Sequence, residues 1–173
     1  GIEVETVAVH TDGDLAGLTT YRVYLTVPNA GDQVTSFTGN DEYPISLTTT
    51  TSFYQNVFGG VTPMDISSGA LALVPELAYD SWVTVGLEQA PVAGEGSIGV
   101  IPGAWSTAFE AGNSFTVNDG VGSGWYIIPP VASNGLAGDD LKVLVAQLTT
   151  DGEIAGSFRT QVFPNGDQVN DVR

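Results

Sequence analysis

The sequence predicts an all-β fold, an antiparallel β-sandwich with jelly-roll-like connections and internal pseudo-symmetry. Three observations predict it. Short runs rich in Val, Thr, Ile, Tyr, Phe and Trp are typical of strands. The 22 glycines and 9 prolines divide these runs at short intervals. Finally, the chain of 173 residues opens and closes on nearly the same phrase, which indicates an internal duplication.

The strand runs follow one another along the whole chain. Residues 19–27 are in part apolar on both faces, so we expect this strand at the centre of a sheet, and residues 141–149 form the most apolar run of all. One short helix is predicted over residues 70–77, and Pro75 limits it to a turn or two. The expected strands are residues 3–9, 19–27, 45–51, 81–87, 97–101, 114–117, 125–128, 141–149 and 153–163.

The turns between these strands contain Asp-Gly and Asn-Gly dipeptides. Both residue types tolerate a positive φ, which tight hairpins require. Asp151-Gly152 lies between two strong strand runs, and it therefore predicts a hairpin.

The repeated phrase has the form turn, strand, turn and occupies residues 11–34 and 150–169. TDGDLAG at residues 11–17 returns as TDGEIAG at 150–156, and PNAGDQV at 28–34 returns as PNGDQV at 164–169. In one interpretation, residues 1–173 are a single β-sandwich domain in which the copies are equivalent strands. In another, the chain belongs to a tandem array with a period near 139 residues. Chance recurrence of ordinary hairpin residues is the third alternative.

Three further phrases carry a resemblance to a known group of proteins. They are FYQNVFGG at residues 53–60, YDSWVTVGL at 79–87 and VLVAQLTTDGEIAG at 143–156. Together they resemble an uncharacterised β-rich domain of exported or surface proteins of marine bacteria and of microalgae. The resemblance implies a β-sandwich module that is often repeated, and it implies no catalytic residue.

Charge and composition narrow the possible partners. Four Lys and Arg residues stand against 20 Asp and Glu, which gives a net charge of −16. Such a surface repels phosphates and anionic lipids, so we expect neither nucleic acid nor a membrane as a partner. No apolar run approaches the 18 or so residues of a membrane span, and the absence of cysteine excludes disulfides and thiolate sites.

Acidic turns are the candidate metal-binding residues. Calcium prefers carboxylate and carbonyl oxygens on flexible loops, and the repeated phrase offers both. The sequence therefore predicts calcium as the one candidate cofactor; the alternative is that these are ordinary solvated turns. The predicted ligands are Asp12, Asp14, Asp151, Glu153 and Asp167.

Two aromatic residues and two arginines complete the candidate residues. Trp125 follows Gly-Ser-Gly and precedes Tyr126, and the two are the best candidate for an exposed platform that stacks on sugar rings; the alternative is that Trp125 packs in the core. Arg22 and Arg159 lie within strands of the repeated phrase. We expect them to have structural roles, as forks that bind Asp or Glu between strands or subunits.

No reactive set of residues emerges from the sequence. His10 is the only histidine, and neither a nucleophile elbow nor a phosphate-binding glycine loop is present. We therefore expect a structural protein and not an enzyme. Copies would associate with one another through β-edge pairing and apolar burial into a filament, sheet or shell, outside the cell or on its surface. The alternative is a calcium-dependent carbohydrate-binding or adhesin module whose partner is a polysaccharide.

Overall fold

The computed structural model describes residues 1–129 and 132–173, and strands dominate this part of the chain. Eleven strands form three antiparallel sheets, accompanied by two short α-helices, α1 (Ser68–Leu73) and α2 (Ala104–Glu110). Sheet A has the order β1 (Ile2–Val9), β2 (Thr19–Thr26), β9 (Lys142–Thr150), β5 (Trp82–Val83). Sheet B has the order β11 (Arg159–Phe163), β3 (Gln33–Gly39), β8 (Ser123–Tyr126), β6 (Gly99–Ile101). Sheet C has the order β10 (Ile154–Ser157), β4 (Ile45–Thr49), β7 (Phe115–Val117).

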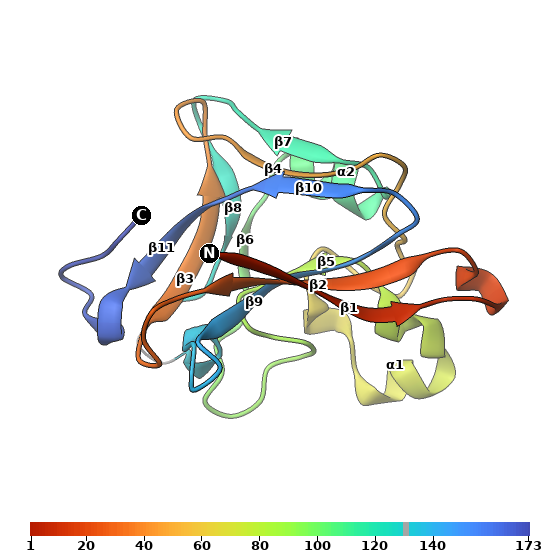
Figure 1. Ribbon diagram of the computed structural model, residues 1–173, viewed down its shortest axis with the longest axis horizontal. Coiled ribbons are helices and arrows are strands. Elements are labelled where there is room, and N and C mark those ends of the chain that lie inside the picture. The colour runs from red at the N-terminus through yellow and green to blue at the C-terminus, as the bar shows by residue number, and fades with distance from the viewer. Residues whose placement is uncertain (130–131) are drawn as a thin grey trace.

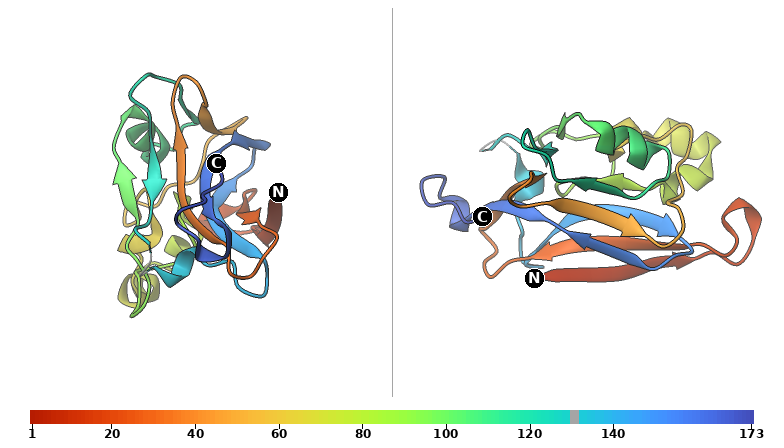
Figure 2. Two further views of the ribbon diagram at one scale, coloured as in Figure 1. Left: turned by 90° about the vertical axis from the view of Figure 1, so that its left-hand side faces the viewer. Right: turned by 90° about the horizontal axis from the view of Figure 1, so that it is seen from above.

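The sheets are arranged as a sandwich, which confirms the predicted all-β antiparallel fold. Sheet A lies below sheet C in Figure 1, and the strands of sheet B run across the left-hand side of the molecule. Seen from above in Figure 2, both helices lie on the side of the molecule away from β1. The side that carries β1 and β10 is therefore free of helices. The jelly-roll-like strand order stays a prediction.

All three sheets contribute to one hydrophobic core. Val23 of β2 and Leu148 of β9 face Phe37 of β3 and Leu47 of β4 within a single cluster of buried side chains. Phe37 stacks on Trp125 with 5.5 Å between ring centroids, and Phe158 meets it edge-on. Sheets B and C thus cover one face of sheet A together.

The other face of sheet A carries a second, smaller cluster. Successive strand residues point to opposite faces, so Trp82 of β5 and Leu144 of β9 point away from the main core. They pack on Ile66, on Leu77 and against α1. The predicted helix at 70–77 is accordingly divided: α1 ends at Leu73, and Pro75 begins a 3₁₀ helix, Pro75–Tyr79. In the described residues, no helix has the length and apolar character needed to cross a bilayer.

Several local predictions need correction. Strand β3, with the sequence QVTSFTG, was not expected, nor was helix α2. The single predicted strand 153–163 is two strands, β10 and β11, in different sheets. The predicted hairpin at Asp151-Gly152 is wrong, because β9 pairs with β2 and β5 while β10 pairs with β4. This turn instead carries the chain from sheet A to sheet C.

The two copies of the repeated phrase adopt different structures. In the first copy, Gly13–Leu15 form a 3₁₀ turn of the β1–β2 loop, whereas in the second copy Ile154–Ser157 are strand β10. The closing halves do meet in space: the Asn165 N–H donates to Oδ1 of buried Asp32 at 2.9 Å. The copies are therefore neighbours without being structurally equivalent, and their descent from one duplicated segment stays a prediction.

Truncating the aromatic centre of the core should destabilise the whole sandwich. We expect Phe37→Ala to lower the free energy of unfolding by about 3–5 kcal/mol, the usual cost of a large-to-small change at a fully buried aromatic position. Urea denaturation measures this change. Val121→Ala is the matched control, because Val121 is exposed, and it should change the free energy by less than about 0.5 kcal/mol. Equal effects of the two substitutions would contradict the packing described above.

Candidate functional site

Strand β1 forms a free edge of the sandwich. Among the described residues it pairs with β2 alone, with Ile2 opposite Leu25 and Val4 opposite Val23. Residues directly opposite on an antiparallel pair share a face, and Val23 belongs to the main core. Ile2 and Val4 thus lie on the core-facing side of sheet A, yet they are 55% and 49% exposed.

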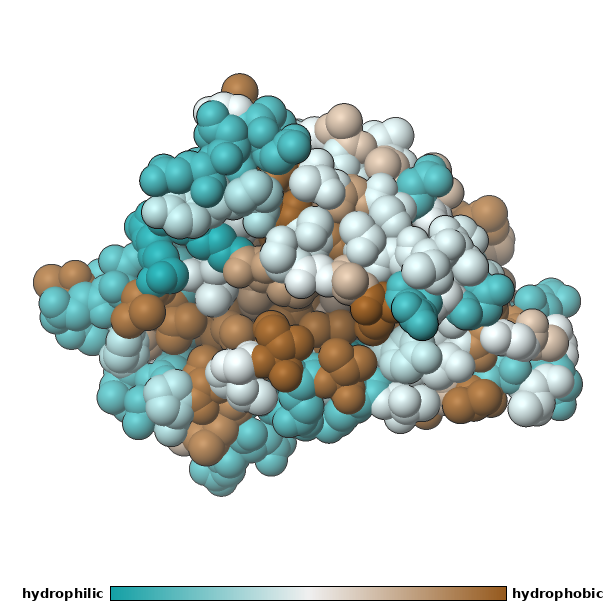
Figure 3. Space-filling view, turned by 45° about the horizontal axis from the view of Figure 1, so that its top comes forward, coloured by the Kyte–Doolittle hydropathy of each residue, from teal (hydrophilic) through white to brown (hydrophobic). Residues whose placement is uncertain are grey.

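An apolar groove explains this exposure. The covering layer ends at β10, which is itself an edge strand and presents the small residues Ala155 and Gly156. A groove of about 120 Å³ therefore separates β1 from β10, and Figure 3 shows apolar surface on this side of the molecule. Its lining residues are Ile2, Val4, Val23, Leu47, Leu148, Ile154, Ala155, Gly156 and Phe158.

The opposite face of β1 carries charge. Glu3 and Glu5 both accept hydrogen bonds from the Lys142 ammonium, at 2.8 Å for Glu3. The hydrogen bond from Lys142 lowers the pKa of Glu5, and the hydrogen bonds to the two carboxylates raise the pKa of Lys142. Lys142 thus offsets part of the negative charge of Glu3 and Glu5, and these three residues together carry one net negative charge. We call β1 together with the groove the open flank.

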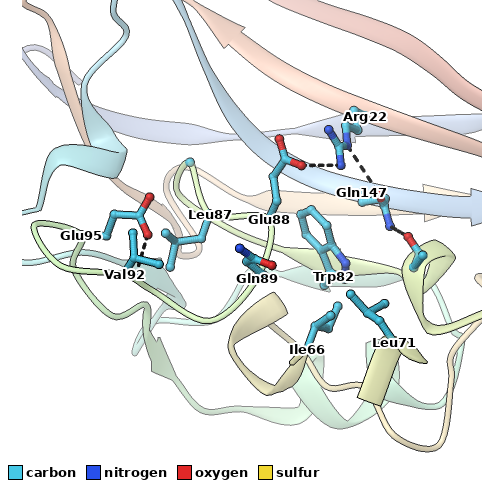
Figure 4. Close-up of a pocket in the computed structure, with 12 residues that line it drawn as sticks. Arg22, Ile66, Leu71, Trp82, Leu87, Glu88, Gln89, Val92, Glu95 and Gln147 are labelled. Carbon is cyan, nitrogen blue, oxygen red and sulfur yellow. Dashed lines mark hydrogen bonds and ion pairs between the residues drawn. The ribbon is translucent and has the colours of Figure 1, made fainter. Parts of the chain in front are cut away.

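A second concave site lies on the outer face of sheet A. Its volume is about 480 Å³, and Figure 4 shows Trp82 at its centre with Ile66 and Leu71 below. The segment 86–95 forms one wall. We call this site the Trp82 pocket. Its lining residues are Arg22, Ile66, Leu71, Ala78, Trp82, Gly86, Leu87, Glu88, Gln89, Val92, Glu95 and Gln147.

Polar side chains border the Trp82 pocket in fixed positions. Arg22 Nη2 donates to Glu88 at 2.7 Å, and Arg22 Nε donates to Gln147 Oε1 at 3.4 Å. Gln147 Nε2 donates to the carbonyl oxygens of Ala78 and Asp80, both at 2.9 Å. The sequence did not predict this pocket, because no local signal connects residues 22, 82, 88 and 147.

The predicted ligand platform at Trp125 is wrong. Trp125 is 0% exposed, its Nε1 donates to the Thr84 carbonyl oxygen at 2.9 Å, and its ring packs between Phe37 and Trp105. Tyr126 is half-buried, and its ring lies against Gly99. Ser123 and Gly124 of the Gly-Ser-Gly sequence before Trp125 already belong to strand β8, so these residues do not form a flexible loop.

The predicted metal ligands lie at two ends of the molecule. Asp12 and Asp14 are in the β1–β2 loop, and Asp151 and Glu153 are in the link from β9 to β10. Thr19 pairs with both Val9 and Thr150, so these two links leave sheet A at the same end. Asp167 is at the other end, where hydrogen bonds from the Asn170 side chain and the Val169 N–H lower its pKa. Within residues 1–129 and 132–173, no group of three or more acidic or histidine residues is arranged to hold a metal ion.

The two arginines differ in their contacts. Arg22 forms the expected ion pair with Glu88, between β2 and the segment 86–95, but through the single contact of Nη2 with Oε2 at 2.7 Å and not as a two-point fork. Arg159 lies over the ring of Tyr43, 4.1 Å from its centroid, and has no carboxylate partner in the described residues. Here the expected ion pair is replaced by a cation–π contact.

Comparisons of this chain with protein-family models, with curated proteins and with solved structures find no match. The resemblance to exported proteins of marine bacteria and microalgae stays a prediction. A functional conclusion therefore depends on the geometry of the described residues.

A buried carboxyl group near the Trp82 pocket was also missed. Asp80 is fully buried; its Oδ1 accepts a hydrogen bond from the Asn56 N–H at 2.7 Å, and its Oδ2 has no partner in the described residues. Burial raises the pKa of Asp80 to about 7. Gly59 packs against this carboxyl group and leaves no room for a side chain, because a Cβ on Gly59 would lie 1.8 Å from Asp80 Oδ2.

Stability should therefore depend on the titration of Asp80. Between pH 3.8, its ordinary pKa, and about pH 7 the folded state holds a proton that the unfolded state has lost, so the free energy of unfolding falls as pH rises through this window. The full effect is about 4 kcal/mol, from 1.36 kcal/mol per unit of pKa difference. Denaturation of the wild type and of Asp80→Asn at a series of pH values measures it, and the variant should lose this slope.

The exposed residue Asp139 provides the control. Asp139→Asn removes the same charge without touching the interior, so its pH profile should parallel that of the wild type. Parallel profiles for Asp80→Asn and the wild type would show that Asp80 does not titrate in this window.

Proposed function

We propose that this chain is a structural protein whose copies assemble through the open flank into a filament, sheet or shell, outside the cell or on its surface. The main support for this proposal is that the unpaired edge of β1 carries the apolar side chains of Ile2 and Val4, which face the core side of sheet A and are exposed. An edge of this kind is a template for another strand. A second copy of β1, running antiparallel, would continue sheet A across the contact and cover Ile2 and Val4 on both sides.

Lys142 lowers the electrostatic cost of bringing two copies together at this edge. The copies repel each other with a charge of −16 each, whereas Lys142 locally offsets Glu3 and Glu5 at β1. The β-bulge between Thr6 and Ala8 interrupts the register, and bulges discourage further pairing. The contact we propose therefore involves the first half of β1, residues 2–6.

Growth beyond a pair requires a second contact. Pairing of β1 with β1 is two-fold symmetric and therefore closed. Strand β6 is another edge, at the end of sheet B, and in the part of the chain that the structure describes it pairs with β8 alone. Ile101 at its end is partly exposed. We propose that β6 supplies the second contact.

A charged residue at the open flank should stop growth into large species. We expect Val4→Lys to convert large species into ones no larger than the pair that the β6 contact alone can hold, because an inward-pointing charge on an edge strand blocks pairing. The substitution also lowers the net negative charge, so a loss of association cannot result from added repulsion. Size-exclusion chromatography with light scattering, and negative-stain electron microscopy, measure the outcome.

Val57→Lys is the control, since it makes the same charge change at an exposed loop position outside the residues that line the open flank. It should assemble at least as well as the wild type. Assembly of Val4→Lys equal to that of the wild type would exclude β1 as the contact, and a wild type that is monomeric in all conditions would overturn the structural role.

Association should increase with ionic strength, because salt screens the repulsion between copies over about 10 Å at 0.1 M. We further propose that calcium, bound by the acidic turns, contributes to this screening. Light scattering in NaCl and in CaCl₂ of equal ionic strength separates the two effects. Larger species in calcium that dissociate with EDTA support specific binding, whereas identical behaviour in both salts would exclude it.

A further inference from the structure

We propose that the Trp82 pocket is a binding site for a small, neutral, hydroxyl-rich ligand of the saccharide class. This inference is independent of assembly, because the pocket is on the outer face of sheet A and the open flank is on the side of β1 and β10. A volume of about 480 Å³ lies within the range of about 300–1,000 Å³ that is typical of ligand sites.

The polar groups of the pocket are already held in place before a ligand arrives. Glu88 and Gln147 fix the guanidinium of Arg22, and two backbone carbonyl oxygens fix the amide of Gln147. Glu95 Oε2 accepts the Val92 N–H at 2.8 Å, which ties the carboxylate to its own loop. Fixed groups lose little conformational freedom when a ligand binds, and this favours affinity.

Each of these charged groups retains unused hydrogen-bonding capacity in the described part of the chain. Glu88 and Glu95 each use a single oxygen, Oε2, in the bonds above. Arg22 uses Nε and Nη2, which leaves the donors on Nη1. The pocket thus offers acceptors and donors side by side, the combination that a hydroxyl group satisfies because it both donates and accepts.

Charge selects against ionic ligands. Two carboxylates and one guanidinium leave the pocket with one net negative charge, on a chain of −16, so an anion is repelled. A cation would meet Arg22, whose position is fixed between Glu88 and Gln147 (Figure 4). A neutral ligand is repelled neither by the net negative charge of the pocket nor by Arg22.

The apolar part of the pocket suits the carbon skeleton of such a ligand. Ile66, Leu71 and Leu87 contribute aliphatic surface, and Val92 borders it from the loop (Figure 4). Trp82 is too buried to offer a stacking face, so recognition relies on aliphatic contact and on the polar border. This distinguishes the Trp82 pocket from a sugar platform built on an exposed aromatic ring.

Nuclear magnetic resonance titration of the monomeric protein at low salt tests the proposal. The probes are glucose, galactose, mannose, maltose and cellobiose, with glucuronate as the anionic counterpart and glucosamine as the cationic one. We expect at least one neutral sugar to shift the amide signals of residues 86–95 at millimolar concentration, and the two charged analogues to bind more weakly.

Two variants place the site. Val92→Trp fills the mouth of the pocket without removing a buried group and should abolish the shifts, whereas Val121→Trp, at an exposed position outside the pocket lining, should leave them intact. Glu95→Gln should weaken binding about tenfold, the effect expected from losing a hydrogen bond to a charged group. Absence of binding by every neutral sugar, stronger binding of a charged analogue, or binding that survives Val92→Trp would overturn the proposal.

Discussion

The packing of β9 is the constraint on which the rest of the structure depends. This strand pairs with β2 on one side and with β5 on the other, and its residues after Lys142 are all buried. Val143, Val145 and Leu148 point into the main core, while Leu144 points into the smaller cluster under α1. Gln147, Thr149 and Thr150 are its buried polar residues, and Gln147 binds the backbone of the 3₁₀ segment at Ala78 and Asp80. The strand then continues through Asp151-Gly152 into β10, so it also joins the two layers of the sandwich.

The parts of the fold that could be predicted are those in which local sequence and tertiary environment agree. The apolar run at 141–149 predicts a strand, which β9 confirms, and Pro75 limits the α-helical part of the predicted helix to the six residues of α1. Strand β3 escaped prediction because its Thr, Ser and Gly residues lower the apolar signal, although most of it is buried between β11 and β8. The four-residue spacing of Trp105 and Phe109 on α2, both buried, was the unused signal for a helix with one apolar face.

The candidate sites were harder to predict than the fold. The groove exists because β10 is short and ends in small residues beside β1, which is a property of two strands that are distant in sequence. Trp125 was misassigned because Gly124 permits a tight approach of the backbones, with φ +153° and the Phe37 carbonyl oxygen 2.1 Å from where a Cβ would be. The sequence alone does not distinguish a glycine that allows close packing from a glycine in a flexible loop.

The pairing of the two ends of the chain has a kinetic consequence. Arg22 lies opposite Gln147 and Thr38 lies opposite Arg159, so the first and last thirds of the chain must meet before either sheet is complete. Contacts between residues so far apart in sequence close slowly, because a long loop loses its freedom before any pairing compensates for it. During this interval β2 and β3 lack the partners that cover them in the native state. A chain of this topology is therefore expected to require slow synthesis or dilute conditions to fold without aggregating.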